Sequence, residues 1–449
     1  MGVGPDAGVV RRPPVPARAR GHPVIRGFAA RERRSWSGAR LPLTTGTGAG
    51  AGAGAAPGSG AATGSGTATW ERRVQLGAHP VAYPLVRALA RIGPVVRVPR
   101  VGVVVSDAAL ARAVLTDTAS FAKTGPGSPA ALWTPVVGPS VLLNMEGAEH
   151  AALRRALADL FTPSAVAALC SRVLAGPCAE LRGRLVAGEA VDLVPVAQRA
   201  AGAVIAGLVG LDARDAAGPA FAAATAVTGM VRLARPELTP RQAARGRAAL
   251  ARITAPAADA YREGGPGTVP GRMRELGLSE REALGAVAAF ALTGTETVVS
   301  FLPRLVALLH DAGLLDALAA DRGGVDACVE EALRVTVPSP VMLRRVAAPA
   351  RIGTVDVVAG DRVVIATVSA ARAHGGFDPD RPHPPALRRL WFGAGPHFCL
   401  GMPLAVAQVR LVLDAVLDAH GQRPLRVVRR RVARRVLIPA YREMVVRGG

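Results

Sequence analysis

A single cysteine, Cys399, stands in a loop of glycine, proline and aromatic residues, WFGAGPHFCLG (391–401), directly before a helical segment. This loop constrains the fold most, because a thiolate that serves as a ligand must be deprotonated, shielded and met by backbone N–H donors. Gly393 and Gly395 let the backbone turn tightly and approach a flat group, and Gly401 frees the chain to enter the next helix. That helix, MPLAVAQVRLVLDAVL, directs its positive N-terminal end at the sulfur, which stabilises negative charge.

The other side chains of the loop suit the same kind of ligand. Phe392 and Phe398 can wall the thiolate from water, and His397 can donate a hydrogen bond to an anionic group beside it. A thiolate in one axial position under a macrocycle that carries carboxylates is haem–thiolate chemistry. The alternative is that Cys399 is a buried structural thiol, as most lone cysteines are.

Composition limits the compartment and the classes of partner. The 449 residues carry a net charge of +22, and Lys123 is the only lysine beside 54 arginines, a bias typical of a GC-rich genome. The arginines are scattered and aromatic residues make up 4%, so nucleic acid is not an expected partner. Four cysteines without C-x-x-C or zinc-type spacing indicate a reducing compartment, and we expect the cytoplasm. No run resembles a membrane span, so no membrane anchor is expected.

The chain divides at about residue 70. Residues 1–69 are rich in Arg and Pro and then in Gly, Ala, Ser and Thr, which predicts a disordered tail. An organellar transit peptide shares the Arg-rich composition but not the glycine and proline breaks. Residues 70–449 are expected to form one mainly helical domain, with strands near 95–107 and 351–367. Several of the predicted helices open with helix-start signals, such as Thr162-Pro163-Ser164 and Ser279-Glu280. Long Ala/Leu-rich segments predict helices at 148–160, 165–187, 194–211, 241–264, 279–310, 312–320, 324–335 and 402–420.

The cysteine loop resembles the haem-binding loop of the cytochrome P-450 enzymes, whose pattern is F-G-x-G-x-H-x-C-x-G. The resemblance covers most of residues 70–449 and is to the soluble bacterial members. It implies a mainly α fold with minor β, in which haem b lies between a long central helix and the helix of the cysteine loop. It also implies that the thiolate of the loop is the axial ligand of the iron. The matching residues are Phe392, Gly393, Gly395, His397, Cys399 and Gly401.

The segment ALTGTETVVSF (291–301) is similar to the oxygen-binding part of the family's central helix. Gly294 weakens the local helical hydrogen-bond ladder, and a threonine hydroxyl can compete for the freed carbonyl, which opens a groove for dioxygen and water. Glu296 and Thr297 can then relay protons into the site as a general acid pair. The alternative is a helix N-cap at Thr293 or Thr295 with an exposed glutamate.

The segment EEALRV (330–335) contains Glu331 and Arg334, the E-x-x-R pair of the family. At a spacing of i, i+3 the two side chains share a helix face and can pair. The resemblance implies a structural role behind the haem, with a third partner from the segment before the cysteine loop. Arg381 is the candidate for that partner.

The segment EGAEHAALRRALADLFTP (146–163) resembles the family's segment with His and Arg four residues apart. His150 and Arg154 share a helix face and are expected to bind a haem propionate with charge assistance. The alternative is a solvated amphipathic helix. Arg345 is the expected further propionate partner, and Arg344 is the competing choice.

The resemblance implies a haem–thiolate monooxygenase that activates dioxygen to hydroxylate or epoxidise a hydrophobic small molecule, in secondary metabolism. Oxidative C–C or C–N coupling, a peroxide-driven haem enzyme and a non-enzymatic haem sensor remain alternatives. No flavin or nicotinamide fingerprint is fused to the chain. A separate ferredoxin and ferredoxin reductase are therefore the implied electron donors to a monomer, and Arg388, Arg389 and Arg410 flank the side where an acidic ferredoxin would dock.

Substrate contacts are expected from five mainly apolar parts of the chain. The regions are 121–141, 219–250, Phe290–Thr297, Pro338–Met342 and the segment near Pro439, with Leu132, Trp133, Val137, Met230, Val341 and Met342 as apolar contacts.

Overall fold

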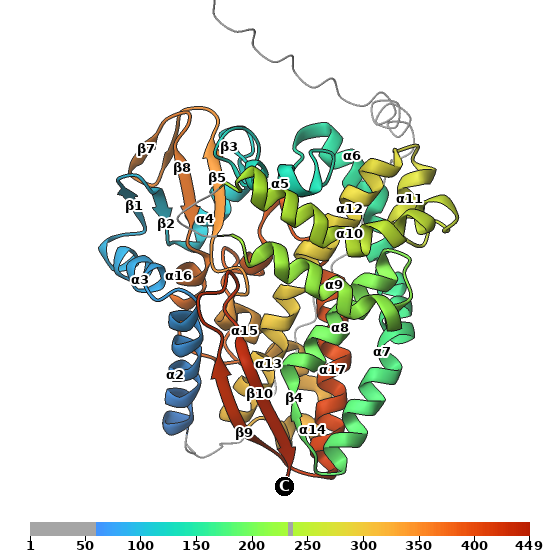
Figure 1. Cartoon of the computed structure of the whole chain (residues 1–449). Helices are drawn as coiled ribbons and strands as arrows, with labels where there is room; N and C mark the ends of the chain where they lie inside the picture. The colour runs from blue at the N-terminus through green and yellow to red at the C-terminus, as the bar shows by residue number, and fades with distance from the viewer. Residues whose placement is uncertain (1–59, 232–236) are drawn as a thin grey trace, which may run out of the picture.

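The structure, a computed structural model, describes residues 60–231 and 237–449 and is mainly helical (Figure 1). The helices of the first half are α2 (Gly60–Ala78), α3 (Ala82–Ile92), α4 (Ala108–Thr116), α5 (Pro129–Val137), α6 (Gly147–Leu157), α7 (Pro163–Val186), α8 (Leu193–Leu208) and α9 (Ala213–Thr228). Those of the second half are α10 (Pro240–Arg262), α11 (Val269–Glu275), α12 (Glu280–Gly294), α13 (Glu296–Asp311), α14 (Leu315–Ala320), α15 (Val325–Thr336), α16 (Thr367–Arg372) and α17 (Met402–Gln422).

Three small sheets accompany the helices. The five-stranded sheet has the order β1-β2-β8-β5-β3, and only its β2–β8 pair is parallel. A three-stranded antiparallel sheet has the order β4-β10-β9, and β6 pairs with β7. The strands are β1 (Val95–Val98), β2 (Gly102–Val105), β3 (Phe121–Ala122), β4 (Ala190–Asp192), β5 (Met342–Val346), β6 (Ala350–Ile352), β7 (Val355–Val357), β8 (Arg362–Ile365), β9 (Leu425–Val432) and β10 (Tyr441–Gly448).

Local sequence explains where the central helices begin. The Thr162 side chain accepts a hydrogen bond from the backbone N–H of Ala165 at the start of α7, and Pro163 occupies the first turn. Ser279 and Glu282 form a reciprocal capping box at the start of α12. Both starts confirm the sequence signals.

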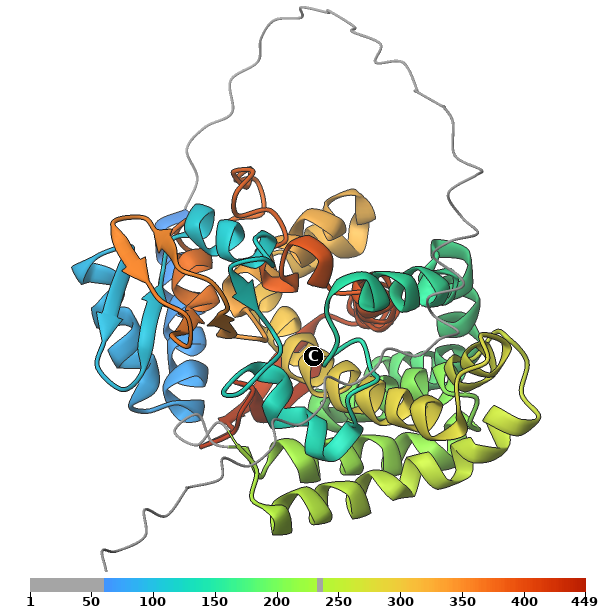
Figure 2. The same ribbon diagram turned by 90° about the horizontal axis from the view of Figure 1, so that it is seen from above.

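The helices α13 and α17 run through the middle of the molecule. The α13 residues from 298 to 309 are all buried, and α17 packs against both α7 and α13 (Figures 1 and 2). The five-stranded sheet lies to one side of this helical body, beside α3. The expected site around Cys399 therefore lies between the buried helix α13 and the loop that leads into α17.

The described part of the chain includes a helix before the expected boundary at residue 70. Helix α2 starts at Gly60, and its Glu71 and Val74 are buried. Residues 1–59 of the expected tail lie outside the described residues.

Two helical stretches of the described chain, Pro163–Val186 and Glu280–Asp311, are long and apolar enough to cross a membrane by length and composition, and the bent pair Leu193–Leu208 and Ala213–Thr228 could count as a third. This differs from the sequence expectation. In the stretch that forms α12 and α13, 61% of the most apolar 18-residue window is buried within the fold, so most of its apolar side chains belong to the protein core.

Candidate functional site

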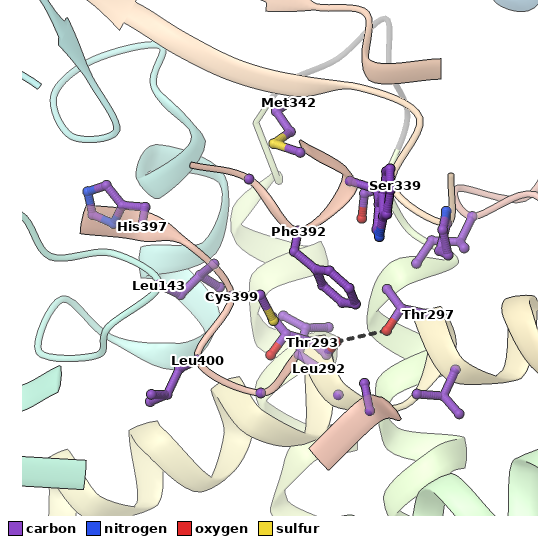
Figure 3. Close-up of a pocket in the computed structure, with 18 of the residues that line it drawn as sticks. Leu143, Leu292, Thr293, Thr297, Ser339, Met342, Phe392, His397, Cys399 and Leu400 are labelled. Atoms are coloured by element: carbon purple, nitrogen blue, oxygen red, sulfur yellow. Dashed lines mark hydrogen bonds between the residues drawn. The ribbon is translucent and has the colours of Figure 1, made fainter. Parts of the chain in front are cut away.

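A cavity of about 590 Å³ lies between the α12–α13 pair and the loop that precedes α17. Figure 3 shows Cys399 on one side of the space and Leu292, Thr293 and Thr297 close by. Most of the lining side chains are apolar. The cavity can therefore hold a large, mainly apolar group against one sulfur atom.

The cysteine loop holds its shape through left-handed glycines and one backbone bond. The backbone φ is 83° at Gly393 and 64° at Gly395, and a Cβ at Gly395 would lie 3.0 Å from both Leu115 O and Thr116 Cα. The Cys399 N–H donates to Phe392 O at 2.9 Å. These constraints fix the sulfur at the cavity wall.

Gly401 shows neither an unusual backbone angle nor a close approach that requires glycine. Its φ is −81°, which any residue adopts, and a Cβ there would lie 4.0 Å from the Cys399 Sγ, an ordinary van der Waals distance. Burial raises the pKa of the Cys399 thiol, while the backbone N–H groups of Gly401 and Met402 and the charge of Arg154 lower it. The N-terminal end of α17 thus directs donors at the sulfur, as the sequence predicts.

Two neighbouring histidines, with their rings tilted by 47° to each other, lie at one end of the cavity. The rings of His150, from α6, and His397 are 4.3 Å apart, and His397 Nε2 lies 3.8 Å from a carboxylate oxygen of Glu146. Burial and nearby cations, Lys123 foremost, lower the pKa of His150 to about 4 and that of His397 to about 2. Both rings are therefore neutral at physiological pH.

Three cationic side chains line the cavity beside these histidines: Lys123, Arg154 and Arg344. Arg154 lies on α6, four residues after His150, as the sequence predicts. Lys123 and Glu146 were not identified from the sequence; the sole lysine was visible there, but its distance from the other cavity residues gave no reason to place it.

Arg344, and not Arg345, lines the cavity. Successive side chains of a strand point to opposite faces, and in β5 Arg344 is 6% exposed while Arg345 lies opposite Ala122 in the β3 pairing. The expectation for Arg345 is therefore corrected in favour of the competing choice. The Nε atom of Arg344 is buried and has no hydrogen-bond partner in the described structure.

The central helix is interrupted between Gly294 and Glu296. Thr293 and Thr295 donate their hydroxyls to Ala289 O and Ala291 O, at 2.8 and 3.0 Å. The Thr297 hydroxyl donates to Thr293 O at 3.4 Å, the bond drawn in Figure 3. Threonine hydroxyls thus donate hydrogen bonds to backbone carbonyls along the interruption of the helix.

The position of Gly294 has a packing reason as well. A Cβ at Gly294 would lie 2.6 Å from the Cδ1 atom of Ile205 on α8. Thr295 occupies the N-cap position of α13, but its hydroxyl makes no capping bond and turns back to α12. The structure therefore does not show the alternative of a side-chain N-cap at Thr293 or Thr295.

Glu296 contacts a second helix instead of facing solvent. The Thr228 hydroxyl, at the end of α9, donates to Glu296 Oε1 at 2.7 Å. Burial raises the pKa of Glu296, and hydrogen bonds from Thr228 and Thr225 partly offset this. Glu296 therefore retains a proton at a higher pH than an exposed glutamate.

Glu331 and Arg334 form a buried pair behind the cysteine loop. Arg334 Nε and Nη2 donate to the two carboxylate oxygens of Glu331 at 2.6 and 2.5 Å. His383 Nε2 lies 2.8 Å from Glu331 Oε2 and supplies the third side chain. Arg381 instead donates to His374 O and to Asp378, so the expectation that Arg381 completes the network is corrected.

The expected substrate regions contribute unequally to the cavity. Trp133, Phe290, Val341 and Met342 line it, whereas Leu132, Val137 and Met230 do not. Residues 232–236 of the expected 219–250 region lie outside the described residues. Leu437 and Ile438, in the expected segment near Pro439, line the cavity as well. Gln75 of α2 and His79, which directly follows α2, also line it and were not identified because they are distant in sequence.

The residues present fit a haem group. Cys399 offers one sulfur ligand at the wall of an apolar cavity, and glycines leave the loop flat beside it. At the end of the cavity lined by the histidines, the buried Nε of Arg344 has no hydrogen-bond partner in the described structure, and further cations lie nearby. Such a group of donors can bind carboxylates.

Comparisons with known proteins agree with this geometry. The family model described as Cytochrome P450 matches residues 324–425. Erythromycin C-12 hydroxylase of Saccharopolyspora erythraea is 31% identical over 301 residues, which span 63% of this chain and 74% of that protein. The Cytochrome P-450 monooxygenase DoxA of Streptomyces sp. (strain C5) is 30% identical over 389 residues, which span 76% and 87%.

Solved structures show the same likeness. The structure of a mutant of P450 EryK in complex with erythromycin B superposes with a TM-score of 0.71 at 28% identity, and covers 83% of this chain and 97% of that one. Together with the cysteine loop at the wall of an apolar cavity, these relationships show that this chain belongs to the cytochrome P450 family.

Proposed function

We propose that this cytochrome P450 monooxygenase inserts one oxygen atom of dioxygen into a bulky hydrophobic molecule held in the cavity, with Cys399 as the thiolate ligand of its haem. The observation that carries the proposal is the position of Cys399 in the cavity wall, close to the interrupted central helix. Of the four cysteines, only Cys399 is among the residues that line this cavity in the described structure.

Bound haem supplies the activation of dioxygen, which a thiolate ligand favours. The chain's own residues prepare the site for it. Backbone N–H groups at the start of α17 stabilise negative charge on the Cys399 sulfur. Phe392 and Phe398, with ring centroids 6.3 Å apart, shield the sulfur from water.

Glu296 and Thr297 are the proposed proton donors. Burial raises the pKa of Glu296, which favours its protonated, donor form relative to an exposed glutamate, and Thr297 lies at the cavity where its hydroxyl can pass a proton inward. Thr293 and Thr297 line the cavity on either side of Gly294, where their hydroxyls can bind water. An intact acid–alcohol pair supports dioxygen, and not peroxide, as the oxidant.

The substrate is proposed to be a bulky natural product. Trp133, Phe290 and Met342 give the cavity an apolar, partly aromatic lining. Two relatives are named erythromycin C-12 hydroxylase and cyclomarin C epoxidase. Hydroxylation or epoxidation in secondary metabolism is the corresponding reaction for this chain.

Electrons are proposed to come from a ferredoxin and its reductase, to a monomer in the cytoplasm. Of the three arginines expected at this surface, Arg410 pairs with Asp326 and Arg389 Nε lies 3.9 Å from Glu330. Arg388 is therefore the arginine proposed to contact an acidic ferredoxin. Electron transfer should therefore slow as salt is raised.

The absorption spectrum of the dithionite-reduced protein with and without carbon monoxide tests the proposal. A strongly red-shifted Soret band is expected for the wild type and should be lost in Cys399→Ser. Cys178→Ser is the matched control, because Cys178 does not line the cavity. A histidine-type band in the wild type, or no haem band in folded protein supplied with haem, would overturn the assignment.

A further inference from the structure

The only lysine of the chain lies in the cavity wall. Arginine outnumbers lysine 54 to one here, so a surface cation would be expected to be arginine. Lys123 directly follows β3, and its backbone N–H donates to Glu146 Oε1 at 2.6 Å. Its ammonium makes no ion pair within the described part of the chain.

The charges around Lys123 do not balance. Arg154 on α6 and Arg344 on β5 line the same cavity, and both are close enough for their charges to act on Lys123. Glu146 is the carboxylate whose charge acts on Lys123 and on Arg344 in the described structure. Three cations therefore face one carboxylate. The charge of Cys399 also acts on Arg154, but this thiolate is the proposed ligand of the iron, so two positive charges remain without a carboxylate.

Buried cations without partners are costly, so this arrangement indicates a ligand that supplies two negative charges. The pair of propionate carboxylates on haem has that charge. We propose that Lys123 is a positioning residue for the cofactor, whose ammonium binds a haem propionate and completes the neutralisation begun by Arg154 and Arg344. This inference rests on the proposed function.

The chemistry of lysine suits the position. An ammonium is a compact point charge on a flexible stem, whereas a guanidinium is a broad planar fork. Near Lys123, the backbone N–H and hydroxyl of Thr124 already bind Glu146 Oε2, at 3.1 and 2.5 Å. A small cation therefore fits beside an occupied carboxylate. Burial, with a contribution from Arg344, lowers the pKa of Lys123 to about 8, so at pH 7 the amine is mainly charged.

The first test compares haem retention in Lys123→Met, Lys123→Arg and wild-type holoenzyme. The rate of haem transfer to excess apomyoglobin should rise roughly tenfold or more in Lys123→Met, because a buried charge partner is lost. Lys123→Arg should recover part of the retention. Arg91→Met, which removes an exposed cation from α3, should match the wild type. Equal rates in Lys123→Met and Arg91→Met would overturn the inference.

The carbon monoxide spectrum separates this inference from the proposed function. If Cys399 is not the ligand, all variants lack the red-shifted band. If only the role of Lys123 fails, Lys123→Met keeps both the band and the wild-type rate of haem loss.

A chemical test covers the case in which Lys123→Met does not fold. Acetylation of the wild-type holoenzyme with an N-hydroxysuccinimide ester can modify one ε-amine, that of Lys123, and the terminal amine. Peptide mass spectrometry should show slow acetylation of Lys123, and the modified fraction should lose haem faster. Rapid acetylation with unchanged haem retention would overturn the inference.

Discussion

At the scale of the residue, Glu296 is held by a neutral hydroxyl on another helix. Thr228 is 5% exposed, lines the cavity and directs its hydroxyl at the carboxylate. No cation is within ion-pairing distance of Glu296 in residues 60–231 and 237–449. The proton affinity of Glu296 is therefore set by burial and by these weak donors.

Replacing Thr228 by valine should change the pH dependence of turnover. The hydroxyl stabilises the charged carboxylate, so its loss raises the pKa of Glu296 further above the ordinary value, and the Glu296 limb of the pH–rate profile should move to higher pH. The shift should be about 0.7 pH unit, the equivalent of one hydrogen bond of about 1 kcal/mol, and turnover on the alkaline side should persist to higher pH than in the wild type. Thr228→Ser should keep the wild-type profile, and an unshifted valine profile would contradict this role.

At the scale of the element, α12 and α13 meet α8 through a glycine. Gly294 allows Ile205 to approach the point where the central helix is interrupted. The break is therefore maintained by packing between helices as well as by threonine hydroxyls along the chain.

Gly294→Ala should destabilise the fold by about 1–3 kcal/mol through overpacking, although alanine favours the helix. Ile205→Val removes the Cδ1 atom that the new methyl group would meet and should cost about 0.5–1.5 kcal/mol alone. Together the two changes should cost less than their sum, as measured by denaturant unfolding of the holoenzyme. Strict additivity would mean that the contact does not matter.

The buried pair at the end of α15 offers a second comparison. His383→Ala should reduce the unfolding free energy by about 1–3 kcal/mol, because a buried Glu331 oxygen loses a hydrogen-bond partner. Arg381→Ala removes an ion pair with Asp378 whose side chains are 34% and 42% exposed, so it should cost less than about 1 kcal/mol. The opposite ranking in thermal and urea unfolding would restore Arg381 as the third partner.

At the scale of the whole molecule, a buried ionic network ties the first described helix to the core. Arg304 of α13 is fully buried, and its Nε donates to Glu71 of α2 at 3.0 Å. Arg372 of α16 also binds Glu71, at 3.1 Å, and Arg304 donates to Pro439 O near β10. Segments far apart in the sequence thus meet at one carboxylate.

Glu71→Ala should destabilise the protein by about 3–5 kcal/mol, because it leaves Arg304 buried without its counter-charge. Asp356→Ala is the control: it breaks a pair with Arg351 in which both side chains are mostly exposed, and should cost at most about 1 kcal/mol. Denaturant unfolding of both variants tests the difference. A similar small effect in both would show that α2 is not held by this network.

The sequence by itself determined the features that depend on near neighbours along the chain. The helix starts at Thr162 and Ser279, the strands near 95–107, and the i, i+3 geometry of Glu331 and Arg334 follow from local chemistry. The cysteine loop was readable for the same reason, since its glycines, cysteine and following helix are contiguous.

Only the tertiary structure decided which distant side chains share a space. Strand register placed Arg344 rather than Arg345 in the cavity, and a fold of the chain brought His383 to Glu331 and Thr228 to Glu296. The place of Lys123 is the clearest case. Its chemistry was visible in the sequence, but the uncompensated charge around it arises only when α6, β3 and β5 are packed together.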